Sequence, residues 1–419
     1  MSDPLFERLW DGSAPMEAWT ESRQGGVITE VADGIIAVHS TYFCGSVTAI
    51  RTAAGLVVID TANPVFAPQT LAAIRRWDAG PIHTVIYTHG HVDHTSGIGG
   101  IDAEAEAKGW PRPRVVGHRN VARRLRRYID THGLNSLVQA QQFNHADFSY
   151  PIGQRVPDEV YDEALALEVG GVRLELFHGR GETDDATFVW LPARKVLVSG
   201  DFVAWVFPNS GNPRKVQRYT PDWAAALRRM AALGPEILVP GHGPVVFGAA
   251  RAAQMLGDGA AALESLVAQT LALMNRGATL DEVLGAVVAP AELVAKPYLV
   301  PKYDDPEFVV RGIWHLYAGW FTGDAAQLKP APAAAVAAEI AALAGGAGVL
   351  AARAEVLARA GQARVAVQLA EYAARAAPED RAVQAAWARV LERQIAEETS
   401  LMGKAFLAVF LREAQARSA

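Results

Sequence analysis

The sequence predicts an α/β domain followed by a helical domain, and two observations carry this prediction. Up to about residue 250, short apolar runs bounded by Gly, Asp or Asn alternate with amphipathic patterns, which is typical of an α/β fold. From Ala249 onward Ala, Leu, Glu and Arg dominate, and periodic apolar positions predict helices broken by Pro- and Gly-containing turns. We therefore expect one domain over residues 1–250 and a second over residues 251–419.

Strands are predicted first as a meander and then in alternation with helices. The predicted strands cover residues 27–31, 34–39, 46–51, 55–60, 84–87, 114–117, 172–177, 186–191, 195–199 and 236–240. Helices are predicted at residues 66–77, 121–131 and 223–233. In the second domain, residues 351–360, 363–376 and 382–397 resemble one tetratricopeptide-type unit, and the plainer interpretation is a helical bundle that buries its own faces.

Composition and charge exclude several classes of protein. With 50% hydrophobic and 20% charged residues, the 419-residue chain is not disordered, collagen-like or a coiled coil. Its formal net charge of −6 argues against nucleic acid and anionic membranes as partners. The single cysteine, Cys44, can form neither an internal disulfide nor a cysteine-based zinc cluster. The apolar tract 331–352 is a poor membrane span and the N-terminus lacks an apolar leader, so we expect a cytoplasmic protein.

The most informative segment is residues 88–97, in which His89, His91, Asp93 and His94 directly follow an apolar run. In a loop at a strand end, His89 and His91 can point to one side while Asp93 and His94 turn toward a second point. Two adjacent sets of N and O ligands could then hold two metals that share a water. The plainer interpretation, a surface loop of polar residues, leaves four ligand-type side chains in this context unexplained.

This segment resembles the HxHxDH motif of the metallo-β-lactamase superfamily, and the preceding meander resembles the first sheet of that family, over roughly residues 25–250. The resemblance implies an αββα sandwich and two further metal ligands, Asp201 and His242, each placed after an apolar run. It implies that Asp201 bridges both metals and that His242 completes the set around Asp93 and His94.

In most of that superfamily a third histidine lies in a Gly-His-Thr turn, but the corresponding turn here, residues 179–185, has Glu182 at that position. A carboxylate still coordinates zinc, although it lowers the Lewis acidity of the metal and admits harder cations. We expect two Zn²⁺ ions, with Mn²⁺ or Fe as alternatives. The alternative to coordination by Glu182 is that Glu182 is a solvated turn residue and that His178 supplies the metal ligand.

Glutamate at this position is a feature of the type III alkyl sulfatases, whose binuclear zinc site is built from His, Asp and Glu. Residues 303–320, followed by 328–330, resemble the segment that leads into the alkyl sulfatase dimerisation domain. The resemblance implies a helical domain that exchanges arms between two subunits and helps to wall the active site. We therefore expect a homodimer, or an assembly with a related subunit.

The sequence departs from these sulfatases in two places. It ends near the end of the expected dimerisation region, before the lipid-carrier-like C-terminal domain of those enzymes. In residues 202–219, where they place Arg and His to hold the sulfate, this sequence has no histidine. The cations there are Arg214, Lys215 and Arg218, and the substrate-binding candidates are Arg214, Arg218, Asn209 and Trp205.

The expected function is that of a binuclear metal-dependent hydrolase in which a metal-activated water cleaves a sulfate ester, with Asp93 or Asp201 accepting the proton. The alternative keeps the site but changes the bond to an aryl ether, a lactone or another ester. The full set of candidate ligands argues against a non-enzymatic scaffold subunit, and the acidic charge argues against a nucleic-acid-processing relative. That set is His89, His91, Asp93, His94, Glu182, Asp201 and His242.

Overall fold

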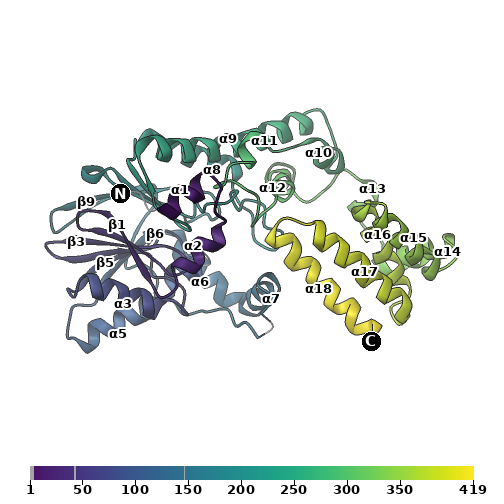
Figure 1. Cartoon of the computed structure of the whole chain (residues 1–419), viewed down its shortest axis with the longest axis horizontal. Helices are drawn as coiled ribbons and strands as arrows, with labels where there is room; N and C mark the ends of the chain where they lie inside the picture. The colour runs from purple at the N-terminus through teal and green to yellow at the C-terminus, as the bar shows by residue number, and fades with distance from the viewer. Residues whose placement is uncertain (1–3, 42–43, 146) are drawn as a thin grey trace.

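The computed structural model describes residues 4–41, 44–145 and 147–419, and it contains two β-sheets, their flanking helices and a group of C-terminal helices (Figure 1). The first sheet has the order β1-β2-β3-β4-β5-β6-β7, with β1 Val27–Ala32, β2 Ile35–His39, β3 Val47–Thr52, β4 Gly55–Ile59, β5 Ile82–Ile86, β6 Arg114–His118 and β7 Glu159–Tyr161. The second sheet has the order β13-β12-β11-β10-β9-β8, with β8 Ala164–Val169, β9 Val172–His178, β10 Thr187–Leu191, β11 Val196–Gly200, β12 Ile237–Pro240 and β13 Val246–Phe247.

Helices connect and cover these sheets. In the α/β part they are α1 Pro4–Trp10, α2 Met16–Ser22, α3 Ala67–Trp77, α4 Val92–Thr95, α5 Ile98–Ala107, α6 Asn120–Asp130, α7 His132–Gln142, the 3₁₀ turn η1 Pro192–Arg194, and α8 Thr220–Ala232. The helices that follow are α9 Ala249–Met274, α10 Leu280–Ala286, α11 Ala291–Val294, α12 Pro306–Ala318, α13 Ala325–Leu328, α14 Ala333–Leu343, α15 Ala347–Arg359, α16 Ala363–Ala376, α17 Arg381–Glu397 and α18 Leu401–Ser418.

The two sheets face each other across a shared hydrophobic core. Val57 and Ile86 of the first sheet belong to the same buried cluster as Val189 and Val198 of the second. A second cluster joins the outer face of the first sheet to α3, α5 and α6, and a third joins the second sheet to α8 and α9. Strands such as β10 and β11 are therefore buried on both faces, which explains their continuous apolar sequence. The predicted αββα sandwich followed by a helical region is confirmed.

The strands named from the sequence agree with the structure within a few residues, whereas β7, β8 and β13 and the helices α1, α2, α4, α5 and α7 were not predicted. The hydrophobic cluster on the outer face of the second sheet runs from Phe6 through Leu238 and Leu256 to Trp314. A separate cluster lies within the C-terminal helices, between Leu350 and Ala414. The apolar core thus continues past residue 250, and the domain boundary there stays a prediction.

The C-terminal helices also contact the α/β part. Arg412 on α18 donates a 2.7 Å hydrogen bond to Asn144 Oδ1, and Gln142 at the end of α7 donates to the Tyr303 hydroxyl, which precedes α12, at 2.7 Å. Across the described ranges, no single helix is long and apolar enough to cross a membrane; α14 and α15 meet the length and composition requirement together, but they meet at 86°. The cytoplasmic location stays a prediction.

Asp304 lies at the junction of these parts, in the segment before α12. Its side chain is 0% exposed, and its Oδ2 accepts a 2.6 Å hydrogen bond from the backbone N–H of Gly211. Its Oδ1 makes no hydrogen bond within the described residues. Burial raises the pKa of Asp304 to about 7, because the charged carboxylate loses its hydration.

We predict that Asp304→Asn raises the melting temperature at about pH 8.5 by a few degrees more than at about pH 5.5. The folded pKa of Asp304 lies above its unfolded value, so the wild type keeps its full stability at low pH and loses part of it as the pH rises toward about 7. Asparagine can accept the Gly211 N–H without ionising. Calorimetry at both pH values tests this, with Asp33→Asn, whose side chain is 96% exposed, as the control. An equal shift at both pH values would contradict it.

Candidate metal centre

The predicted ligands lie on loops at the carboxyl ends of strands from both sheets. His89 and His91 follow β5, and the short helix α4 carries Asp93 and His94. Asp201 and His242 follow β11 and β12, and Glu182 lies in the turn between β9 and β10. Because β11 and β12 are parallel neighbours, their carboxyl ends lie side by side. Both sheets thus direct ligand-type side chains to one edge of the sandwich.

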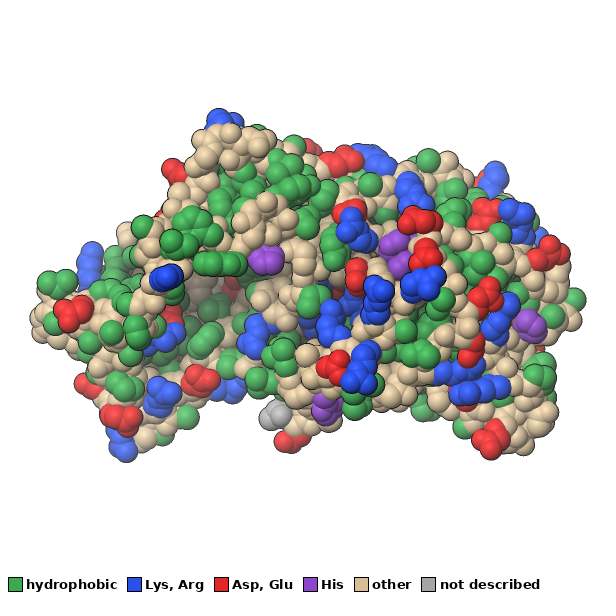
Figure 2. Space-filling view, turned by 180° about the vertical axis from the view of Figure 1, so that it is seen from behind, with side chains coloured by type: hydrophobic (Ala, Val, Ile, Leu, Met, Phe, Trp, Pro, Cys, Tyr) green, Lys and Arg blue, Asp and Glu red, His purple; other side chains and the backbone are tan. Residues whose placement is uncertain are grey.

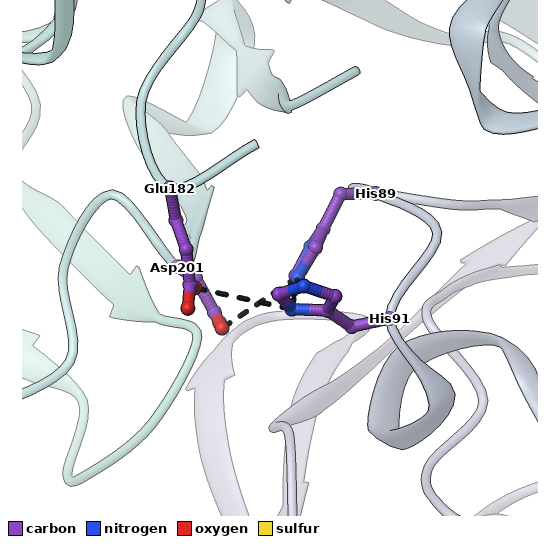
Figure 3. Close-up of side chains that lie close together, drawn as sticks. All are labelled: His89, His91, Glu182 and Asp201. Atoms are coloured by element: carbon purple, nitrogen blue, oxygen red, sulfur yellow. Dashed lines mark hydrogen bonds and ion pairs between the residues drawn. The ribbon is translucent and has the colours of Figure 1, made fainter. Parts of the chain in front are cut away.

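The first group joins two imidazoles from the first sheet to two carboxylates from the second (Figure 3). His89, His91, Glu182 and Asp201 offer ligand atoms that lie within 4.8 Å of one another. His89 Nε2 lies 3.6 Å from Asp201 Oδ2, and His91 Nδ1 lies 3.9 Å from Glu182 Oε2. The side chains point toward one another from opposite sides, an arrangement that can surround one cation.

Asp93, His94 and His242 form a second group beside the first. Asp93 Oδ2 lies 3.5 Å from His94 Nε2 and 3.4 Å from His242 Nε2. Asp201 Oδ1 lies 3.2 Å from His94 Nε2 and 3.4 Å from His242 Nε2, while its Oδ2 faces the first group. The carboxylate of Asp201 therefore lies between the groups and offers one oxygen to each.

Two buried atoms between these groups test whether a cation fits. Within the described residues, neither His94 Nε2 nor Asp201 Oδ1 makes a hydrogen bond, although they face each other at 3.2 Å. Buried polar atoms nearly always have a hydrogen-bond partner, so this pair calls for another ligand. Imidazole nitrogens and carboxylate oxygens are the donors that zinc and related divalent cations prefer. The donor set fits metal binding.

The Glu182 side chain is held by two donors. Arg218 Nη1 donates to Glu182 Oε1 at 2.5 Å, and Asn209 Nδ2 donates to the same oxygen at 2.9 Å, so that Oε2 is turned toward His91. Burial raises the pKa of Glu182 to about 7, and the Arg218 guanidinium opposes this rise. The structure thus places Glu182 in the first group and buries it, which argues against a solvated turn residue.

His178, the alternative ligand, lies outside both groups. Its Nδ1 donates a 3.0 Å hydrogen bond to the carbonyl of Ala186, and its ring stacks on His118 with centroids 3.8 Å apart. These contacts fix the imidazole away from Asp201, so the geometry favours Glu182 over His178 as the partner of His89 and His91.

Asp60 orients the second group, and sequence reasoning missed it. Its Oδ2 accepts a 2.7 Å hydrogen bond from His94 Nδ1, and its Oδ1 accepts the Thr88 N–H at 2.7 Å. Since Nδ1 carries the hydrogen, Nε2 of His94 can direct its lone pair toward Asp93 and Asp201. Asp60 directly follows the apolar run of β4, which is the same strand-end position that drew attention to the other carboxylates.

A buried ion pair supports the histidine loop, and it was also missed. Arg124 Nε donates to Asp185 Oδ1 at 2.8 Å, and Asp185 Oδ2 accepts the N–H of Gly90 at 3.0 Å. Both side chains are nearly inaccessible, at 3% and 0% exposure. Because Gly90 lies between His89 and His91, this pair fixes the backbone from which both imidazoles extend.

The charge states of the histidines differ between the groups. Burial lowers the pKa of His89 to about 4, which leaves that ring neutral near pH 7. Burial also opposes the charge of His94 and His242, but the nearby carboxylates, chiefly Asp201, raise the pKa of His94 well above its usual value and that of His242 to about 10. A cation that binds the second group must therefore displace protons.

Both groups open into a cavity of about 550 Å³ with a largely apolar lining. In the space-filling view the surface is hollowed between the α/β part and the C-terminal helices, and hydrophobic side chains line the hollow (Figure 2). Of the predicted substrate-binding residues, Trp205, Asn209 and Arg218 line the cavity. Arg214 is exposed, donates to Gln141 at 3.0 Å and lies outside the lining.

Comparison with known proteins identifies two families that match this chain. Residues 43–242 match the metallo-beta-lactamase superfamily, and residues 279–416 match the alkyl sulfatase dimerisation family. A linear primary-alkylsulfatase of Pseudomonas sp. (strain ATCC 19151) is 28% identical over 317 residues, covering 71% of this chain and 60% of the relative. An (R)-specific secondary-alkylsulfatase of Pseudomonas sp. is 27% identical over 316 residues, covering 68% of this chain and 47% of the relative.

A solved structure shares the fold. The stereoselective inverting sec-alkylsulfatase from Pseudomonas sp. superposes with a TM-score of 0.82 at 23% identity, covering 93% of this chain and 66% of that one. At this identity the likeness shows the fold alone. The chain spans 60% and 47% of the lengths of the two curated relatives.

We predict that Asp201→Ala removes most of the bound metal, because its carboxylate faces both groups. The matched control is His178→Ala, whose ring lies outside both groups. Metal per chain, measured by plasma mass spectrometry after zinc loading and gel filtration, should fall in the first variant and stay at the wild-type value in the second. Equal metal content in the wild type and Asp201→Ala would contradict the predicted ligand set.

Proposed function

Because the chain carries a metallo-beta-lactamase superfamily domain and an alkyl sulfatase dimerisation domain, we propose that it is a hydrolase that uses two zinc ions to cleave a sulfate ester with an apolar chain. The observation that carries this proposal is that both candidate metal groups line one largely apolar cavity. The proposed ligands are His89, His91, Glu182 and Asp201 for one ion and Asp93, His94, His242 and Asp201 for the other. When bound, two such ions supply an activated water and stabilise charge that develops on the substrate.

The protein residues have three tasks in this proposal. Asp93 or Asp201 accepts the proton of the attacking water, since both carboxylates lie at the meeting point of the groups. Arg218 and Asn209 hold Glu182 in place through hydrogen bonds to a single oxygen. The apolar lining excludes water from the remainder of the cavity and accommodates the chain of the substrate.

We predict that the zinc-loaded protein releases sulfate from decyl sulfate and that Glu182→Ala lowers the rate at least about 100-fold. Loss of an outer partner of a metal ligand alone typically costs about 10- to 100-fold in metal affinity or activity, and here a proposed ligand itself is lost. Sulfate release is measured by ion chromatography. Glu163→Ala, which removes an exposed carboxylate, should keep the wild-type rate.

Two results would contradict this assignment. Sulfate release that survives Glu182→Ala would point to a contaminating enzyme. No release by a metal-replete protein would remove the sulfate ester from the proposal, and hydrolysis in a panel of aryl ethers, lactones and carboxylic esters would then support the alternative bond.

We also propose that the protein forms a homodimer through its C-terminal helices. Residues 279–416 match the dimerisation family, and α14 ends in Leu343, which is 89% exposed. Sedimentation equilibrium should give twice the mass of one chain, and Leu343→Asp should weaken the association because a charge would replace apolar surface. Lys404→Asp, on the exposed side of α18, is the control. A monomer at micromolar concentration would contradict this proposal.

A further inference from the structure

Two cationic side chains, Lys215 and Arg218, line the cavity beside the candidate metal centre. The charge of Arg218 is engaged, because its guanidinium is 4% exposed and pairs with Glu182. Its Nη1 also donates to the carbonyl of Asn209. Within the described residues, the Lys215 ammonium makes no hydrogen bond and no ion pair. Of the two side chains, Arg218 has a charged partner and Lys215 has none within the described residues.

The backbone around Lys215 is held from several sides. Its N–H donates to the carbonyl of Asn212 at 3.3 Å, and Asn212 Nδ2 lies 3.2 Å from the sulfur of Met402 on α18. The neighbouring Gly211 N–H donates to Asp304, and Gln217 is hydrogen-bonded to His315 of α12 at 2.6 Å. The ammonium therefore extends from a braced segment, and little ordering is needed when a ligand arrives.

The Lys215 ammonium is partly desolvated, and the cavity supplies no dedicated counter-ion for it. Burial, and after it the charge of Arg218, lowers the pKa of Lys215 to about 8, while Glu182 and Asp93 oppose this effect. The side chain is therefore mostly charged at neutral pH although it is partly desolvated. Both opposing carboxylates belong to the proposed metal ligands, so neither serves as a dedicated counter-ion of the ammonium. A buried charge is stabilised when a hydrogen-bonded partner of opposite sign is supplied.

We propose that the Lys215 ammonium binds the anionic group of the substrate, between the candidate metal centre and the apolar part of the cavity. The inference rests on the proposed function, since it assigns the group that holds the sulfate in a segment that lacks a histidine. Phe143, Phe148 and Leu299 supply apolar lining for the chain attached to that anion. The ligand class is an anion with an apolar tail, and Lys215 distinguishes it from a neutral amphiphile of the same length.

The test is equilibrium binding of 1-decanesulfonate, an analogue without the ester oxygen, to the zinc-loaded full chain by calorimetry. Lys215→Met should weaken sulfonate binding about 10- to 100-fold, as expected for the loss of a charge-assisted hydrogen bond, and leave 1-decanol binding unchanged. Lys215→Arg should restore most of the affinity. Lys302→Met is the matched control, because Lys302 is exposed and precedes the cavity-lining Tyr303 but is itself outside the lining.

Each outcome decides the inference separately from the proposed function. Sulfonate binding that is equal in the wild type and Lys215→Met, or absent from the wild type, would overturn it, even if the enzyme released sulfate from decyl sulfate. A loss of 1-decanol binding equal to that of the sulfonate would overturn it as well, because the effect would then be structural. Binding that depends on Lys215 supports it even if no sulfate is released. Decanoate binding is measured in the same way. If Lys215→Met weakens decanoate binding as much as sulfonate binding, Lys215 recognises anionic groups in general.

Discussion

The candidate site depends on how closely the edges of the two sheets approach each other. A side chain at Gly200, whose φ is +53° and which ends β11 of the second sheet, would bring its Cβ to 2.9 Å from Cβ of Thr88, which lies between β5 of the first sheet and His89. Two backbone hydrogen bonds of 2.7 Å, from Thr187 N–H to the Thr88 carbonyl and from Ser46 N–H to the Gly241 carbonyl, join the edges of the two sheets. Only with this contact can imidazoles from one sheet meet carboxylates from the other.

The close contact of the two sheet edges brings the charged ligand side chains together. Buried hydrogen-bond partners then determine how these side chains are oriented. Asp60 fixes the ring of His94, and Arg124 with Asp185 fixes the backbone between His89 and His91. These partners hold the ligand side chains in position, which lowers the cost of ordering them around a cation. Removal of one partner would leave an uncompensated buried charge, which makes such pairs sensitive points for stability as well as for metal affinity.

The parts of the fold that the sequence predicted are those in which burial dictates composition. β10 and β11 are covered on both faces, and each reads as a continuous apolar run. β8 is an edge strand with half of its positions exposed, and α5 begins with Ile98, Gly99 and Gly100, so neither shows a strong pattern. The histidine loop was predictable because its ligand types are clustered, whereas the partners Asp60 and Arg124 are single residues far away in the sequence. Their roles follow from tertiary packing alone.

The α/β part and the region after α9 contribute different residues to the site. All seven candidate ligands come from the α/β part, but Tyr298, Leu299 and Tyr303, from the region after α9, complete the wall of the cavity. Tyr303 is fixed by the hydrogen bond from Gln142, and the segment before it is tied to the start of α18. Changes in the helical region can therefore alter the length and shape of the cavity without disturbing the ligands. The chemistry and the choice of substrate can thus vary separately in this architecture, because different segments determine each.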